Sequence, residues 1–205
     1  MKNLVFSFIT LLAFGLFGAF TTVEPPQAVP AWQIDATHSS VSFQVRHFFS
    51  NVLGTFDKFG GKLHFDPADL KGSSVSFEIE VASVNTKDEK RNGHLQSASF
   101  FDVEKWPTMS FKSTEFKKGE ADNEYVVSGE MTIRDVTKKV ELPVKFLGQM
   151  DHMMRENYLV GGFSTEFIIN RNDYGVGVGD WAATAVIGDE IKVNINLEVN
   201  RQKDS

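Results

Sequence analysis

Apolar and polar side chains alternate with a period of two from residue 32 onward. The last run is the clearest, because its odd positions from Ile191 to Val199 are aliphatic and its even positions are Lys, Asn, Asn and Glu. A strand with one dry and one wet face produces this pattern, which is typical of antiparallel sheets. The pattern predicts eight strands, at residues 33–48, 52–66, 73–83, 108–116, 124–134, 139–149, 159–170 and 188–200.

Strand length favours a closed barrel over an open sheet. Several predicted strands exceed ten residues, and barrel closure removes the edges that long strands would otherwise expose. In the second strand the apolar positions change from even to odd, which predicts a bulge near Asp57 and Lys58. We therefore expect an all-β fold, an eight-stranded antiparallel, lipocalin-like barrel.

Two segments lack the alternation of apolar and polar residues. Residues 87–98 are polar and predict one short helix after the third strand, with Asn85 or Thr86 as its N-cap. Residues 171–187 contain three glycines at alternate positions and predict a long loop that lies across one end of the barrel.

The N-terminal residues predict export. Lys2 precedes an apolar run over residues 4–20, so residues 1–22 are interpreted as a signal peptide, with an uncleaved anchor as the alternative. A proline-containing linker at 23–31, the barrel domain at 32–200 and a tail at 201–205 complete the chain. We expect a periplasmic or secreted protein with no membrane span in its mature part.

The amino-acid composition excludes several classes of function. The 19 Phe, against 3 Tyr and 3 Trp, imply a large dry interior, which is either a Phe-filled core or a Phe-lined cavity. The net charge of -6 and the lack of a basic stripe argue against nucleic acid as a partner. With 0 Cys, disulfides and cysteine metal sites are excluded.

Several motifs together resemble one known family. They are WQIDATHSSVSFQVRH at 32–47, VLGTFDKFGGKLHFDP at 52–67, SVNTKDEKRNGHLQSASFFDVEKWPTMSF at 83–111, GEMTIRDVTKKVELPV at 129–144 and INRNDYGVG at 169–177. In these motifs, over residues 32–199, the chain resembles the YceI-like family of lipocalin-like, lipid-binding proteins. It departs from the family pattern where Asp, Gly and Pro are usual, at Asn92, Asp135 and Lys139.

The resemblance implies an elongated barrel holding an isoprenoid quinone precursor, a polyisoprenoid or a fatty amide. It also implies a periplasmic or secreted location and, in many members, a homodimer. We therefore expect a carrier or store for a long-chain isoprenoid or fatty-acid-derived lipid.

Residues on the apolar strand faces are candidates for lining the lipid site, although each of them could equally belong to a plain core. The candidates are Val41, Phe43, Val45, Phe65, Val75, Phe77, Ile79, Phe111, Met131, Ile133, Phe163 and Phe167. Polar and aromatic residues near strand ends and in the helix are candidates for the mouth or for contact with a head group. They are His38, Arg91, His94, Trp106, Arg171 and Asp173.

Enzyme motifs are lacking. The chain contains no GxSxG, Walker or GxGxxG motif, so we expect a binding protein with no catalytic residue. The five histidines show no HxH or HExxH spacing, so no metal and no cofactor other than the lipid is expected. Two alternatives remain: an enzyme that acts on the barrel-bound lipid, and an envelope stress or adhesion protein without a ligand.

Overall fold

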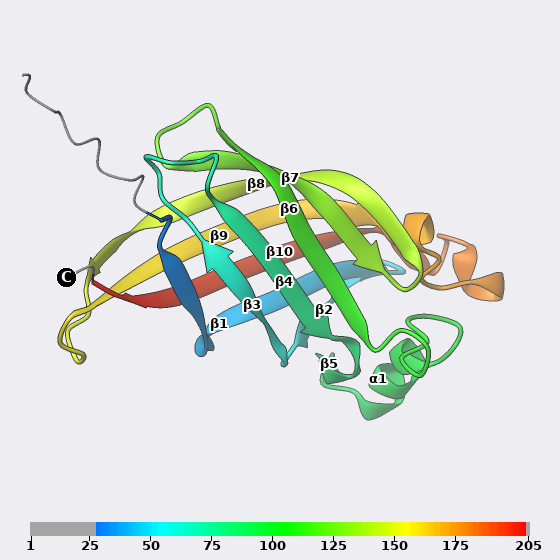
Figure 1. Ribbon diagram of the computed structural model, residues 1–205. Helices are drawn as coiled ribbons and strands as arrows, with labels where there is room; N and C mark the ends of the chain where they lie inside the picture. The colour runs from blue at the N-terminus through cyan, green and yellow to red at the C-terminus, as the bar shows by residue number, and fades with distance from the viewer. Residues whose placement is uncertain (1–27, 204–205) are drawn as a thin grey trace, which may run out of the picture.

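The predicted eight-stranded antiparallel barrel is confirmed in the computed structural model, which describes residues 28–203 (Figure 1). Pairing follows the order β10-β9-β8-β7-β6-β4-β3-β1-β2, and β1 pairs with β10 to close the barrel. The strands are β1 (Ala31–His47), β2 (Ser50–Phe56), β3 (Phe59–His64), β4 (Ser74–Glu80), β5 (Val84–Asn85), β6 (Thr108–Lys118), β7 (Glu124–Ile133), β8 (Val136–Asp151), β9 (Tyr158–Asn170) and β10 (Ile187–Gln202).

The barrel begins one residue before its predicted limit and ends two residues after it. Ala31 opens β1 and pairs with His64. Arg201 and Gln202 belong to β10 and pair with Leu159 and Tyr158 of β9, although the sequence pattern places them in a tail. The predicted signal peptide at 1–22 and most of the predicted linker lie outside the described residues.

β2 and β3 are two halves of one bent strand, and the two-residue β5 pairs only with β2, so the ten labelled strands make an eight-stranded barrel. β2 pairs with the second half of β1, whereas β3 pairs with Ala31 and Trp32 at its start. The break falls at Asp57 and Lys58, where the shift in apolar phase predicts an irregularity. A bend of this kind lets one long strand follow the curvature of the wall.

The predicted helix is present as α1 (Glu89–Gln96), but its predicted N-cap is wrong. Asp88 is the N-cap, and its carboxylate accepts a hydrogen bond from the backbone N–H of Arg91 at 2.9 Å. Thr86 instead donates its N–H and its hydroxyl to Oδ1 of Asn92, at 2.8 and 2.7 Å. Asn92, where the family usually has Asp, thus anchors α1 to the end of β5.

No helix within residues 28–203 combines the length and the hydropathy that crossing a bilayer requires.

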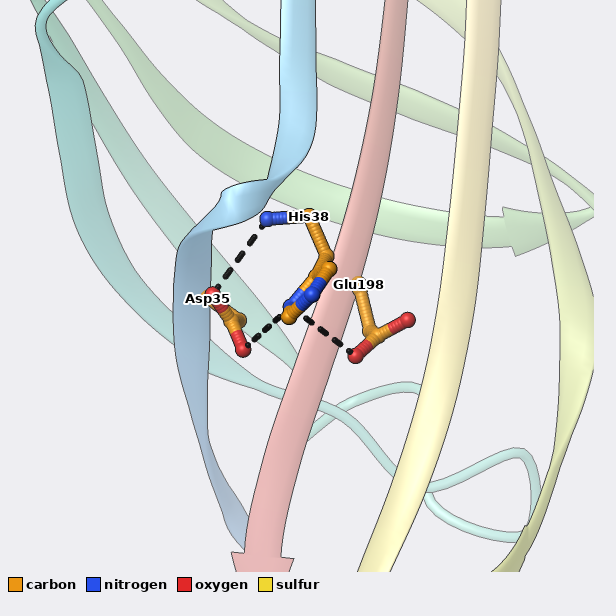
Figure 2. A group of neighbouring side chains, drawn as sticks. All are labelled: Asp35, His38 and Glu198. Carbon is orange, nitrogen blue, oxygen red and sulfur yellow. Dashed lines mark hydrogen bonds and ion pairs between the residues drawn. The ribbon is translucent and has the colours of Figure 1, made fainter.

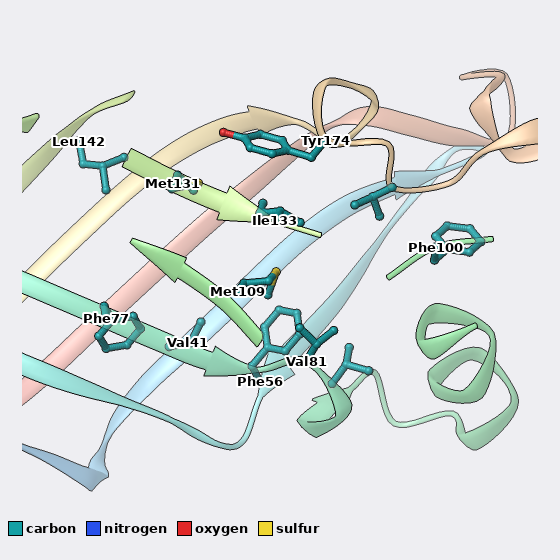
Figure 3. Packing of buried hydrophobic residues seen from close by; sticks show 12 residues of the cluster. Val41, Phe56, Phe77, Val81, Phe100, Met109, Met131, Ile133, Leu142 and Tyr174 are labelled. Carbon is teal, nitrogen blue, oxygen red and sulfur yellow. The ribbon is translucent and has the colours of Figure 1, made fainter. Parts of the chain in front are cut away.

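The apolar strand faces form two buried clusters along the barrel axis. The larger cluster reaches from Val41 and Leu142 to Phe100 and Tyr174, and Figure 3 shows its side chains pointing inward from several strands. The second cluster, around Phe65, lies toward the other end. In Figure 1, α1 and the orange segment after β9 lie at the right end, opposite the β8–β9 hairpin and the C-terminal end of β10.

Candidate functional site

An apolar cavity of about 230 Å³ lies inside the barrel. Most strands contribute to its wall, and β10 presents the four consecutive inward positions from Ile191 to Leu197. Arg171 is the one charged residue of the lining. The cavity therefore offers a hydrocarbon surface, which favours an apolar ligand.

Eleven of the twelve residues proposed from the strand pattern line this cavity. Alternation on the strands explains the agreement, because residues of one parity face the interior of a barrel. The eleven are Val41, Phe43, Val45, Val75, Phe77, Ile79, Phe111, Met131, Ile133, Phe163 and Phe167.

Phe65, the twelfth, does not line the cavity; it faces inward but closes one end of the barrel. Its ring centroid lies 5.1–5.2 Å from those of Tyr125, Phe146 and Phe163 and 6.2 Å from that of Phe116. We call these five residues the aromatic plug. Trp32 supports it by donating its indole N–H to the carbonyl of Phe65 at 3.2 Å, and burial raises the pKa of the Tyr125 hydroxyl. From the plug, the cavity extends toward the α1 end, where Leu95, Phe100 and Phe101 line it.

Arg171 organises the loop at the α1 end of the cavity. Its guanidinium is buried and donates to the carbonyls of Gly188, Val176, Gly177 and Ile187 at 2.9–3.2 Å. Burial lowers its pKa, because the charge has lost contact with water. Arg171 thus lies at the cavity as predicted, but its N–H groups hold the loop.

Gly177 has to be a glycine in this arrangement. Its φ of +80° is strained for other residues, and a Cβ there would lie 2.3 Å from Nη1 of Arg171. Gly177 therefore allows the loop to wrap around the guanidinium, and Gly175 and Gly179 have a positive φ of 63° that also favours glycine. The segment between β9 and β10 lies at the α1 end of the barrel, as predicted, and its Val176 lines the cavity (Figure 1).

A second arginine, Arg134, also lies at the α1 end of the cavity, and the sequence pattern did not predict it. Its guanidinium donates to the carbonyls of Phe100 and Gly175 and lies 4.6 Å from the ring centroid of Trp106. The β7–β8 turn thereby ties the segment after α1 to the loop after β9. Nothing in the local pattern marks Arg134, because its partners lie 34 and 41 residues away.

The other mouth candidates fall into two groups. The ring of His94 contacts those of Phe100 and Trp181, with centroids 4.8 and 4.7 Å away, so His94 lies directly behind the lining residue Phe100 at the α1 end. Arg91 instead donates to Thr86 nearby in the chain, and Asp173 forms a surface ion pair with Lys138 of β8. Asp173 is exposed, lies in the turn Arg171–Tyr174 and pairs with Lys138, not with Arg171. Trp106 is half-buried beneath Arg134 and does not line the cavity.

His38 lies on the outer surface of the barrel, away from the mouth. It contacts Asp35 of its own strand and Glu198 of β10 (Figure 2). The hydrogen bond to Asp35, together with the charges of both carboxylates, raises the pKa of His38, and the same bond lowers the pKa of Asp35. A role for His38 at the lipid head group is therefore not supported by its position.

Comparison with known proteins agrees with this architecture. The family model described as the YceI-like domain matches residues 32–199. The chain belongs to the YceI-like family. Protein YceI of Salmonella agona is 33% identical over 204 residues, which cover 98% of this chain and 99% of that protein. A UPF0312 protein of Pectobacterium carotovorum is 34% identical over 170 residues, covering 82% of this chain and 84% of that protein.

Solved structures of YceI-like fold superpose on the barrel. BcnA of Burkholderia cenocepacia is similar with a TM-score of 0.72 and 27% identity, covering 80% of this chain and 98% of that one. A YCEI protein of Campylobacter jejuni gives 0.68 and 29%, covering 76% and 88%. A domain of Saccharophagus degradans described as polyisoprenoid-binding gives 0.61 and 18%, covering 84% and 98%, and shares the fold.

Proposed function

We propose that this member of the YceI-like family is exported and holds the hydrocarbon chain of a lipid inside its barrel, as a carrier or store. The observation that carries the proposal is the 230 Å³ cavity, whose wall is apolar and whose far end is closed by the aromatic plug. Such an enclosure removes hydrocarbon from water without needing a specific polar contact. Export rests on the apolar N-terminal sequence.

The size of the cavity limits how much of a lipid's hydrocarbon chain it can hold. An apolar cavity of roughly 150 Å³ accommodates benzene, so by proportion one of 230 Å³ accommodates about nine carbon atoms. At about 0.8 kcal/mol per buried methylene, nine carbons gain roughly 7 kcal/mol before the ordering cost of binding is subtracted. A medium-length chain fits entirely, and a polyisoprenoid would place its terminal part inside and the rest beyond the mouth.

In this proposal the polar head group of the lipid lies at the α1 end of the cavity, outside the apolar lining. The N–H groups of Arg171 already donate to loop carbonyls, so the interior offers no free charge to a head group. The lining also includes no Asp, Glu, His or Cys. Both observations support binding without chemistry over an enzyme that acts on the bound lipid.

The comparison with the domain of Saccharophagus degradans adds little to the choice of ligand. At 18% identity it shares the fold, and its description applies to that protein. A polyisoprenoid and a fatty-acid derivative therefore both remain within the proposal, which depends on the cavity.

A chain-length series tests the proposal. The full-length protein, stripped of lipid, is titrated with saturated fatty acids of increasing length. We expect affinity to rise with length up to about nine carbons and then to level off, because further carbons stay outside the cavity. Absence of binding at every length would contradict the proposal.

A blocking variant makes the same experiment specific to the cavity. Val193→Trp places an indole in the lining and should weaken binding at least tenfold, whereas Ile168→Trp on the outer face of β9 should bind normally. Thermal unfolding of both variants confirms that they fold. Equal binding by the two variants would place the lipid outside the barrel.

A further inference from the structure

A bulge in β1 gathers three side chains on the outer surface of the barrel. Asp35 pairs with Glu198 of β10, and the next pair in register is Ser40 with Asn196, so β1 carries extra residues between them. The extra backbone brings His38 back over Asp35. Figure 2 shows the imidazole lying between the two carboxylates, at the junction of the first and last strands.

The atoms that face one another have the spacing of metal ligands. Nδ1 of His38 lies 3.0 Å from Oδ2 of Asp35 and 3.7 Å from Oε1 of Glu198. Two ligand atoms bound tetrahedrally to one zinc ion, with bonds of about 2.1 Å, are about 3.4 Å apart. The two measured distances lie on either side of this value, and all three ligand atoms lie within 4.8 Å of one another.

The ligand atoms are also oriented. Oδ1 of Asp35 accepts the backbone N–H groups of Thr37 and His38, at 3.0 and 3.4 Å, which turns Oδ2 toward the imidazole. Contacts of this kind fix the direction of a metal-binding carboxylate. Asp35 and Glu198 are direct cross-strand partners, so the two carboxylates converge on the same imidazole.

The geometry points to a divalent transition-metal site formed by Asp35, His38 and Glu198, with zinc as the ion that fits. One imidazole nitrogen and two carboxylate oxygens form a mixed ligand set that suits zinc, whereas calcium and magnesium prefer oxygen alone. The side chain of His38 is 62% exposed, so a fourth position is open to water. The site is independent of the lipid cavity, which lies inside the barrel.

A metal here would join the two ends of the described chain. β1 and β10 form the pair that closes the barrel, and a ligand from each strand would hold them together. An ion that binds the folded chain more tightly than the unfolded one raises stability. Sequence spacing does not reveal this site, because Glu198 lies 160 residues beyond His38 along the chain and the bulge sets the register.

Zinc titration of the full-length, untagged protein after EDTA treatment tests the site. We expect one zinc per chain by calorimetry, and a rise in Tm that saturates with zinc but not with equal magnesium or calcium. His38→Ala and Glu198→Gln should each weaken zinc binding at least tenfold. His47→Ala, which removes another exposed histidine of β1, should leave it unchanged.

Nitrogen chemical shifts of the histidine rings give a second measurement that does not depend on stability. Zinc should shift Nδ1 of His38 and leave the ring of His47 unaffected. Zinc binding that survives His38→Ala, or a chain that takes up no zinc, would overturn the assignment. Thermal unfolding without metal confirms that both alanine variants fold.

Discussion

The ring of Phe43 packs directly on the backbone of Gly54, its partner across the β1–β2 pair. A Cβ at residue 54 would lie 2.3 Å from Cζ of Phe43, so the absence of a side chain lets the ring lie against the wall of the cavity. The volume available to a ligand therefore depends on a glycine that makes no contact with the ligand itself.

Replacing this glycine should cost both stability and binding. Gly54→Ala forces the Phe43 ring into the cavity and should lower the free energy of unfolding by about 1 kcal/mol, as overpacking does. Gly60→Ala is the matched control, because a Cβ there meets no atom within 4 Å and the substitution should be neutral or slightly stabilising. Urea unfolding and fatty-acid titration of the two variants check this. Equal behaviour of both would show that Phe43 has room to move.

Arg171 should stabilise the loop after β9 more than it contributes to ligand binding. Arg171→Met leaves the carbonyls of Gly188, Val176 and Gly177 without their donor and should cost about 3 kcal/mol. Arg155→Met, in the exposed β8–β9 hairpin, serves as the control. Urea unfolding gives both values, and a loss below about 1 kcal/mol for Arg171→Met would contradict its role as the anchor of the loop.

Removing the centre of the aromatic plug should lengthen the cavity. Phe65→Ala costs about 3–5 kcal/mol of stability as a large-to-small core substitution. The space joins the existing cavity through Phe163, so the preferred fatty-acid length should increase by several carbons. Phe65→Leu is a milder variant that keeps the comparison available if the alanine variant unfolds. An unchanged length preference in a folded variant would mean that the plug does not limit the ligand.

Lipid uptake should depend on the α1 end of the barrel. Phe48 and Phe49 are exposed at the β1–β2 turn, and the N–H of Phe48 donates to Val186 in the mouth loop. Phe49→Ser should slow uptake of a fluorescent fatty acid from phosphatidylcholine vesicles, because this apolar ring lies at the entrance. Met153→Ser removes a similarly exposed apolar side chain in the β8–β9 hairpin at the opposite end. Stopped-flow rates should fall for the first variant alone; a larger effect at Met153 would place the entrance at the other end.

The strand faces could be predicted from the sequence because a period of two assigns each residue to one side of the wall. This rule placed residues such as Val41, Phe77 and Met131 correctly along the cavity. It could not distinguish the aromatic plug from the rest of the lining, because Phe65 and Phe77 both face inward and only their position along the barrel axis separates them.

Contacts that depend on strand register could not be predicted from the sequence. Arg134 reaches Phe100 and Gly175 from a turn, and His38 meets Glu198 through a bulge whose offset no local pattern encodes. The N-cap of α1 was misplaced for a related reason, since Thr86 is held by Asn92 and leaves Asp88 to cap the helix.

Native mass spectrometry of the full-length protein, incubated with a bacterial lipid extract, tests most directly whether the barrel encloses a hydrocarbon chain. We predict one lipid per barrel for the natural chain and for Ile168→Trp, and the bare protein mass for Val193→Trp. Detection of the natural chain without bound lipid, or of the Val193→Trp variant with the same lipid, would contradict the account.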